Sequence, residues 1–142
     1  MMDKEKLALQ GLDHIGIVVR DLEATAAALE RTLGLKLEDV ENYRDTLRIG
    51  FLPLGPIDIE LIEPVTDEGL NAEFLHERGE GVHHVAFAVE DLEASLAHAV
   101  EQGAKLLLAP TIGARGRRIA FLEGDGLGGT ILELVASPKV DE

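Results

Sequence analysis

The chain of 142 residues contains no cysteine, so it offers no disulfide, no thiolate metal ligand and no thiol nucleophile. It has no tryptophan, one tyrosine and four phenylalanines, which leaves almost no material for stacking nucleic-acid bases. Any metal site in this protein must therefore be built from histidine, aspartate and glutamate side chains.

Basic residues are also few, because 13 Lys and Arg stand against 27 Asp and Glu, a formal net charge of −14. This charge repels phosphate backbones and anionic membranes, so we expect no nucleic-acid partner and no membrane partner. A local basic patch can still bind an anionic small molecule. The sequence has no apolar run of about 18 residues and no apolar stretch of signal-peptide type at its start, which predicts a soluble cytoplasmic protein.

The chain repeats itself at an offset of 84 − 14 = 70 residues, about half its length. HIGIVVRDLEA at 14–24 recurs as HVAFAVEDLEA at 84–94, and IDIELIEP at 57–64 lies opposite TILELVASP at 130–138. Each half predicts a strand, a helix and then further strands, which gives two βαβββ modules.

Helix and turn signals set the expected boundaries within each module. Asp21 and Asp91 are predicted N-caps, and Gly34 and Gly103 are predicted helix stops. The fold class we expect is α+β, with the two tandem modules forming one curved mixed sheet that has its helices on the convex side. The expected organisation is a single domain over 1–142, with module one at about 11–63, a connector at 64–81 that holds a short helix near Ala72–Glu77, and module two at about 82–137.

Strand alternation assigns the histidines to a face of the sheet. Ile15, Ile17 and Val19 form the apolar side that must pack under the first helix, so His14 points to the opposite face. By the same parity, the repeat places His84 on that opposite face and turns His83 the other way. Only one histidine of the HisHis dipeptide is therefore a candidate ligand.

Two glutamates interrupt apolar strand segments near the ends of the two halves. Glu60 lies between Ile59 and Leu61, and Glu133 lies in the corresponding place of the second half. A carboxylate on a buried strand is costly unless it is paired or bound to a metal. If the halves form one curved sheet, two histidines and two glutamates converge on its concave side: His14, Glu60, His84 and Glu133. Such a set suits a divalent ion of zinc, cobalt, manganese, nickel or iron.

A simpler interpretation is that these polar residues occupy a solvated strand face and bind no metal. A lone histidine or glutamate in a strand is usually such a residue. Here both residue types recur at matched places in the two halves, and this joint pattern favours the metal site.

The pattern resembles the vicinal oxygen chelate superfamily, which includes glyoxalase I, extradiol dioxygenases and antibiotic-resistance proteins. The resemblance covers residues 11–137, and within the superfamily the sequence is most similar to the methylmalonyl-CoA epimerases. The segments that carry it are LDHIGIVVRDLE, IELIEP, FLHERGEGVHHVAFAVEDLE and IGARGRRIAFLEGDGLGGTILEL.

This resemblance implies a metal-dependent epimerase that inverts C2 of methylmalonyl-CoA by proton abstraction through a metal-stabilised enolate. It places the metal ligands on the four residues that parity had selected. Glu133 is the first candidate for the catalytic base, and Glu60 is its possible partner. An acyl-CoA substrate and a homodimer are implied as well.

Two of the departures of the sequence from the family concern candidate site residues. Some members carry a further acid at a position that here is Ile49, and the upstream residues Glu41 and Asp45 are possible substitutes. The loop GARGRR brings three arginines together, namely Arg115, Arg117 and Arg118. They are candidates for binding a substrate phosphate or carboxylate, and the alternative is a solvated loop.

Two other functions remain open on the sequence alone. A glyoxalase I-type lyase, or another metal-dependent enzyme of the superfamily, would use the same residue types. A non-catalytic resistance protein that sequesters a small molecule is less favoured, because such proteins usually lack the metal residues and prefer aromatic grooves.

Overall fold

The computed structural model describes residues 9–137, and the chain divides into two compact units. Among the described residues, the first unit comprises 14–83 and the second comprises 9–13 together with 84–137. The chain passes between units inside two strands, β1 (Leu9–Val18) and β5 (Gly81–Val89). Within the described residues, no helix is long and apolar enough to cross a membrane.

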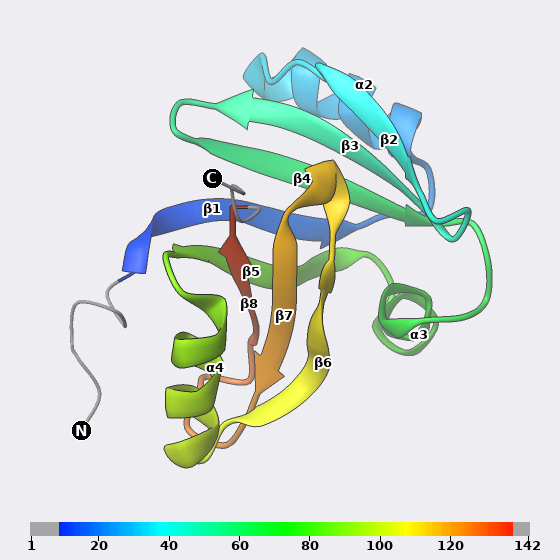
Figure 1. Cartoon of the computed structure of the whole chain (residues 1–142). Coiled ribbons are helices and arrows are strands. Elements are labelled where there is room, and N and C mark those ends of the chain that lie inside the picture. The colour runs from blue at the N-terminus through cyan, green and yellow to red at the C-terminus, as the bar shows by residue number, and fades with distance from the viewer. Residues whose placement is uncertain (1–8, 138–142) are drawn as a thin grey trace. The chain divides into compact units, whose positions relative to one another are not determined.

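The first unit is a mixed sheet with the order β2-β3-β4-β1, and helix α2 packs across one face of it (Figure 1). Strands β1 and β4 are parallel, and the other neighbours are antiparallel. After residues 14–18 of β1, its elements are α2 (Leu22–Leu33), β2 (Asp39–Tyr43), β3 (Leu47–Leu54), β4 (Ile57–Pro64) and α3 (Leu70–Arg78).

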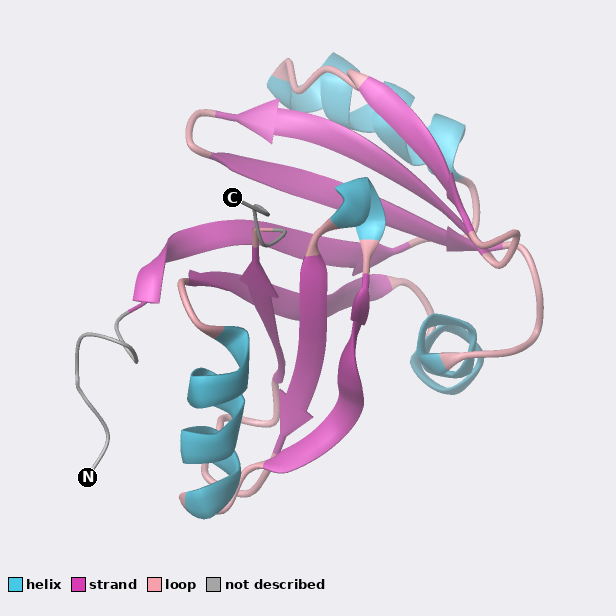
Figure 2. Cartoon of the chain, in the orientation of Figure 1, coloured by secondary structure: helices cyan, strands magenta, loops and turns pink. Residues whose placement is uncertain are grey.

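The second unit repeats this plan with the strand order β5-β8-β7-β6, in which β5 and β8 are the parallel pair. Figure 2 shows its one long helix beside these strands and a short helical turn between β6 and β7. After β5, its elements are α4 (Leu92–Glu101), β6 (Lys105–Ile112), the 3-10 turn η1 (Ala114–Gly116), β7 (Arg118–Glu123) and β8 (Ile131–Ala136).

Both long helices begin as the cap residues predict. The carboxylates of Asp21 and Asp91 accept hydrogen bonds from the backbone N–H groups of Ala24 and Ala94, each at 3.0 Å. Gly34 ends α2 in the left-handed conformation, with φ 76°. Helix α4 ends one residue earlier than Gly103 predicts, because Gln102 is its C-cap and donates to the last carbonyl groups.

Each helix buries one face of its own sheet. In the first unit, Leu22 and Ala26 of α2 form a core with Val19, Leu52 and Leu61. Ile17 and Ile59 pack against this core, which confirms the predicted inward side of β1. In the second unit the core contains Val89, Leu92, Leu96, Ala120, Leu122, Leu134 and Ala136, with Phe87 packed against it.

The predicted α+β class and the two βαβββ modules are therefore confirmed. The connector contains the expected short helix as α3, which begins two residues before Ala72 and extends one residue beyond Glu77. That the chain forms a single domain over 1–142 stays a prediction.

Candidate metal and acid–base site

The first unit buries a histidine next to a glutamate on the face of the sheet opposite to α2. Gly16 of β1 is directly across from Glu60 of β4, and His14 lies two residues earlier on the same side of β1. Nδ1 of His14 is 3.0 Å from a carboxylate oxygen of Glu60. The two residues are only 3% and 4% exposed, so the chain holds an ionisable pair away from water.

The second unit holds the matching pair on β5 and β8. Ala86 is directly across from Glu133, and His84 again lies two residues before the partner of the glutamate. Nε2 of His84 is 3.4 Å from a carboxylate oxygen of Glu133, and both residues are almost fully buried. The two units thus place the same two side chains at the same two register positions.

A phenylalanine accompanies each pair, and the sequence analysis missed this part of the site. Phe51 lies across from Glu60, and Phe121 lies across from Glu133. The ring of Phe121 is 5.1 Å from the ring of His84 between centroids. Phe51 and Phe121 are 70 residues apart, which is the offset of the repeat. Comparison of the two halves could therefore have identified them as matched residues of the site. Each phenylalanine thus places an apolar ring on the strand next to a buried glutamate.

His83 points away from this face, as parity predicts. Its ring packs edge-on against Phe74 of α3, with 5.0 Å between centroids. Burial, and secondarily the charge of Arg78, lower the pKa of His83 to about 4, so its imidazole is neutral at physiological pH. His83 is a core residue of the first unit.

The donor chemistry of the two pairs fits a divalent cation. Imidazole nitrogen and carboxylate oxygen are ligands for zinc, manganese, cobalt, nickel and iron. In each pair one such nitrogen and one such oxygen already face each other at contact distance. Because a buried carboxylate is costly without a partner charge, a bound cation would stabilise both pairs.

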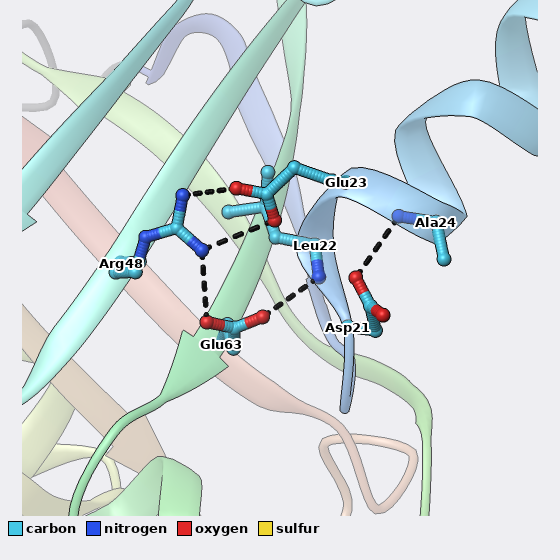
Figure 3. Close-up of polar contacts among 6 residues, drawn as sticks. All are labelled: Asp21, Leu22, Glu23, Ala24, Arg48 and Glu63. Carbon is cyan, nitrogen blue, oxygen red and sulfur yellow. Dashed lines mark hydrogen bonds and ion pairs between the residues drawn. The ribbon is translucent and has the colours of Figure 1, made fainter.

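Arginines tie the start of each helix to its sheet, and Figure 3 shows the first of these clamps. Arg48 of β3 bridges Glu23 of α2 and Glu63 of β4, and its Nη1 is 3.1 Å from Glu63. The other oxygen of Glu63 accepts the backbone N–H of Leu22 at 2.8 Å. The hydrogen bond from Arg48 lowers the pKa of Glu23.

The second clamp is the copy of the first at an offset of 70 residues. Arg118 of β7 pairs with Glu93 of α4, just as Arg48 pairs with Glu23. The hydrogen bond to Glu93 raises the pKa of Arg118. This arginine, predicted as a substrate contact, therefore lies on the helix side of its sheet and anchors α4.

The other two arginines of the loop have different surroundings. Nη1 of Arg117 is 2.5 Å from the carboxylate of Asp13, and both side chains are about four-fifths buried, at 22% and 18% exposure. Arg115 is exposed at the turn between β6 and β7, with a left-handed backbone at φ 60°. A non-glycine residue in that conformation carries local strain.

The chain matches the family described as the Glyoxalase/Bleomycin resistance protein/Dioxygenase superfamily over residues 13–121. A curated relative, the ethylmalonyl-CoA/methylmalonyl-CoA epimerase of Cereibacter sphaeroides, is 35% identical over 127 residues. That alignment covers 87% of this chain and 95% of the relative.

Two solved structures of methylmalonyl-CoA epimerases are also similar to this chain. A methylmalonyl-CoA epimerase variant from Streptomyces coelicolor, in complex with 2-nitronate-propionyl-CoA, has a TM-score of 0.84 at 32% identity, covering 93% of this chain and 100% of that chain. The methylmalonyl-CoA epimerase of Mycobacterium tuberculosis has a TM-score of 0.83 at 30% identity, covering 98% and 94%. The predicted enzyme class, an epimerase-like isomerase, is confirmed by these relatives. The chain belongs to the glyoxalase/bleomycin resistance protein/dioxygenase superfamily.

Proposed function

We propose that this protein is a metal-dependent epimerase that inverts C2 of methylmalonyl-CoA. The observation that carries the proposal is the pair of buried His–Glu contacts, repeated in both units of a chain whose relatives are named as epimerases of this substrate. The acyl-CoA compound bound to the Streptomyces enzyme supports the substrate class.

The proposed metal ligands are one pair from each unit, namely His14 with Glu60 and His84 with Glu133. The ion would be cobalt, manganese, zinc, nickel or iron. When bound, it would act as a Lewis acid toward the thioester carbonyl beside C2. The chain's own contribution is to desolvate this carbonyl and to orient it with buried side chains.

Glu133 is the proposed base. Its carboxylate would accept the C2 proton: the C–H bond breaks, an O–H bond forms, and the electron pair moves into the adjacent carbonyl. Of the two buried pairs, His84–Glu133 has the longer contact, 3.4 Å against 3.0 Å for His14–Glu60. Glu60 of the matching pair is the proposed partner of Glu133 in proton transfer.

Of the three loop arginines, Arg115 and Arg117 remain the proposed contact for the charged groups of the acyl-CoA, whereas Arg118 pairs with Glu93 on the helix side of its sheet. Arg115 is the loop arginine to test first, because it is exposed at the turn between β6 and β7. Replacing Arg115 with glutamine should raise KM with little change in kcat. A variant with unchanged KM would show that this loop does not reach the substrate.

Metal binding is tested by elemental analysis of the purified chain. The proposal expects about one divalent ion per chain, and its loss in the His14→Ala and His84→Ala variants. His83→Ala is the matched control, because its imidazole packs against Phe74 on the other side of β5. Two ions per chain, or full occupancy after either ligand is removed, would contradict a shared site.

The reaction is tested by deuterium uptake at C2 of methylmalonyl-CoA in heavy water. Metal-loaded protein should catalyse the uptake, and both a chelator and Glu133→Gln should abolish it. Glutamine keeps an oxygen for the ion but cannot accept a proton, and Glu101→Gln on the exposed end of α4 is the control. No uptake by the metal-loaded protein would reject the proposal, and methylglyoxal with glutathione would then be assayed.

The remaining parts of the proposal concern the whole protein. We propose a single domain, a homodimer and a cytoplasmic location. One calorimetric transition and a sedimentation mass of twice the chain mass of 15.3 kDa would support the first two.

A further inference from the structure

The face of the second-unit sheet that carries Glu133 has small side chains on one side of this residue and large ones on the other. On β5, Ala86 lies directly across from Glu133, and Ala88 is the next residue on the same face. On β7, Phe121 lies directly across from Glu133, and Ile119 is the next residue on that face. Ile119 is therefore a diagonal neighbour of Glu133, a placement at which long side chains of adjacent strands come within reach of each other.

Ile119 differs from the other large apolar residues on this side of Glu133 because it is only partly buried. Phe121 is 5% exposed, and Val135, the partner of Ile119 on β8, is 2% exposed. Ile119 itself retains intermediate exposure. On the β7 side of Glu133, Ile119 is therefore the apolar side chain that a bound molecule can contact.

The backbone of the loop after β6 packs against Ile119. A Cβ atom at Gly113 would lie 2.7 Å from Cδ1 of Ile119 and 3.0 Å from both of its Cγ atoms. A larger residue at 113 would thus force the loop or the isoleucine side chain to shift. The N–H of Gly113 donates to the carbonyl of Arg117 at 2.7 Å, which closes the loop. Since isoleucine is also stiff at χ1, its side chain is a fixed boundary on this face.

The matching isoleucine of the first unit is not accessible in this way. Ile49 precedes Ile119 by 119 − 49 = 70 residues, and it is only 6% exposed. Its neighbour strand β2 pairs with β3 in continuous register. In the second unit, β6 shifts register against β7 between Leu106 and Leu108 and again before Thr111, which lies across from Ile119. Such bulges bend an edge strand, so only the second unit reshapes its edge beside this position.

We propose, resting on the epimerase function above, that Ile119 is a specificity-determining residue that limits the size of the alkyl group at C2. For Glu133 to accept the C2 proton, C2 must lie within about 3 Å of its carboxylate. The alkyl group on C2 then packs against the neighbours of Glu133 on this face. A methyl group fits beside the fixed side chain of Ile119, whereas a longer group must displace it. The substrate class is therefore a CoA thioester of malonate with a small 2-alkyl group.

The test is a competition between methylmalonyl-CoA and ethylmalonyl-CoA, which has an additional methylene at C2, in heavy water with metal-loaded protein. Deuterium uptake into the two thioesters in one mixture gives the ratio of their kcat/KM values. The unmodified protein should prefer methylmalonyl-CoA. Ile119→Ala should shift the ratio toward ethylmalonyl-CoA by on the order of 10-fold, which is the usual effect of a methylene in an apolar pocket. Ile119→Val should shift it in the same direction by less.

The ratio separates a role in specificity from a structural role, because loss of folded protein lowers both rates equally and leaves their ratio unchanged. Ile119→Val keeps the β-branched side chain, so it provides the measurement if the alanine variant is unstable. Ile112→Ala is the matched control. It removes the same atoms from the end of β6 on the helix side of the sheet, where Ile112 is 47% exposed and its partner is Arg118.

The possible failures are distinguishable. An unchanged ratio in both Ile119 variants, an equal shift in Ile112→Ala, or equal use of the two thioesters by the unmodified protein would overturn the role of Ile119 and leave the epimerase function standing. Absence of exchange from both thioesters in the unmodified protein would instead reject the epimerase function, and this proposal with it.

Discussion

Gly50 of β3 lies close to the side chains that cover its sheet, which limits the size of the residue at this position. A Cβ atom at this position would lie 3.0 Å from Cδ2 of Leu22 and 3.0 Å from Cδ1 of Leu37. Real Cβ atoms are rarely this close to a neighbour, so the side-chain ends of Leu22 and Leu37 would have to shift by a few tenths of an ångström to admit one. The repeat has Ala120 at the matching place in the second unit, where it is fully buried.

We therefore expect Gly50→Ala to lower the free energy of unfolding by about 1–3 kcal/mol, because the added methyl overpacks the core. Urea denaturation would measure this change. Gly124→Ala is the matched control, since a Cβ there would meet its nearest atom at an ordinary 3.4 Å and the backbone needs no left-handed conformation. Equal stability of the two alanine variants would show that α2 can shift away from β3 without cost.

The pKa of Glu23 is a direct measure of its ion pair with Arg48. Arg48 lowers its pKa from the ordinary 4.5, so the ionised carboxylate stabilises the folded state. This stabilisation is complete above the ordinary pKa and is lost as the pH falls through the lower, folded-state value. NMR titration of the Glu23 carboxyl carbon should give a pKa below 4.5 that returns toward it in Arg48→Gln. A pKa unaffected by that substitution would mean that the ion pair is absent in solution.

At the scale of elements, each helix is fixed at its first turn by three devices that the repeat has copied. These are the aspartate N-cap, the arginine from the third or seventh strand, and the apolar residue that follows the cap. The first helix has an additional acceptor, because Glu63 binds the N–H of Leu22. The first turn of α2 is thus held to β3 and β4, and the first turn of α4 is held to β7.

The cap of α4 should be worth a measurable share of the stability. Asp91→Ala removes the acceptor for the Ala94 N–H and should cost about 1 kcal/mol in the free energy of unfolding. Asp91→Asn keeps a side-chain oxygen at the cap and should cost much less. If alanine and asparagine were equally destabilising, the loss would come from charge near the helix start and not from the cap hydrogen bond.

At the scale of the whole molecule, the charge of −14 acts on any anionic substrate. If the substrate is an acyl-CoA, long-range repulsion should slow its approach at low ionic strength. We expect kcat/KM to rise as salt increases from about 0.01 M to about 0.15 M, because the Debye length shortens from about 30 Å to about 8 Å. Steady-state kinetics with kcat as the internal control would measure it. A fall in kcat/KM with salt would show that the loop arginines dominate the approach.

Most of the helices and strands could be predicted from the sequence, because strand alternation and helix caps depend only on residues close together in the chain. Alternation at 15, 17 and 19 assigned the inward side of β1, and the aspartate caps marked where both helices begin. The 70-residue repeat then transferred each assignment to the second unit. The end of α4 was placed one residue too late, because the last helical hydrogen bonds were satisfied by Gln102 before Gly103 was reached.

By itself, the sequence determined that His14, Glu60, His84 and Glu133 share one kind of strand face, since side-chain alternation has a period of two and needs no knowledge of neighbours. Tertiary structure decided which groups meet. It paired Arg118 with Glu93, Arg117 with Asp13 and Asp45 with Asn42. The physical reason is that strand register and ion-pair partners are contacts between residues far apart in the chain, and the turns that set them leave only a weak local signal.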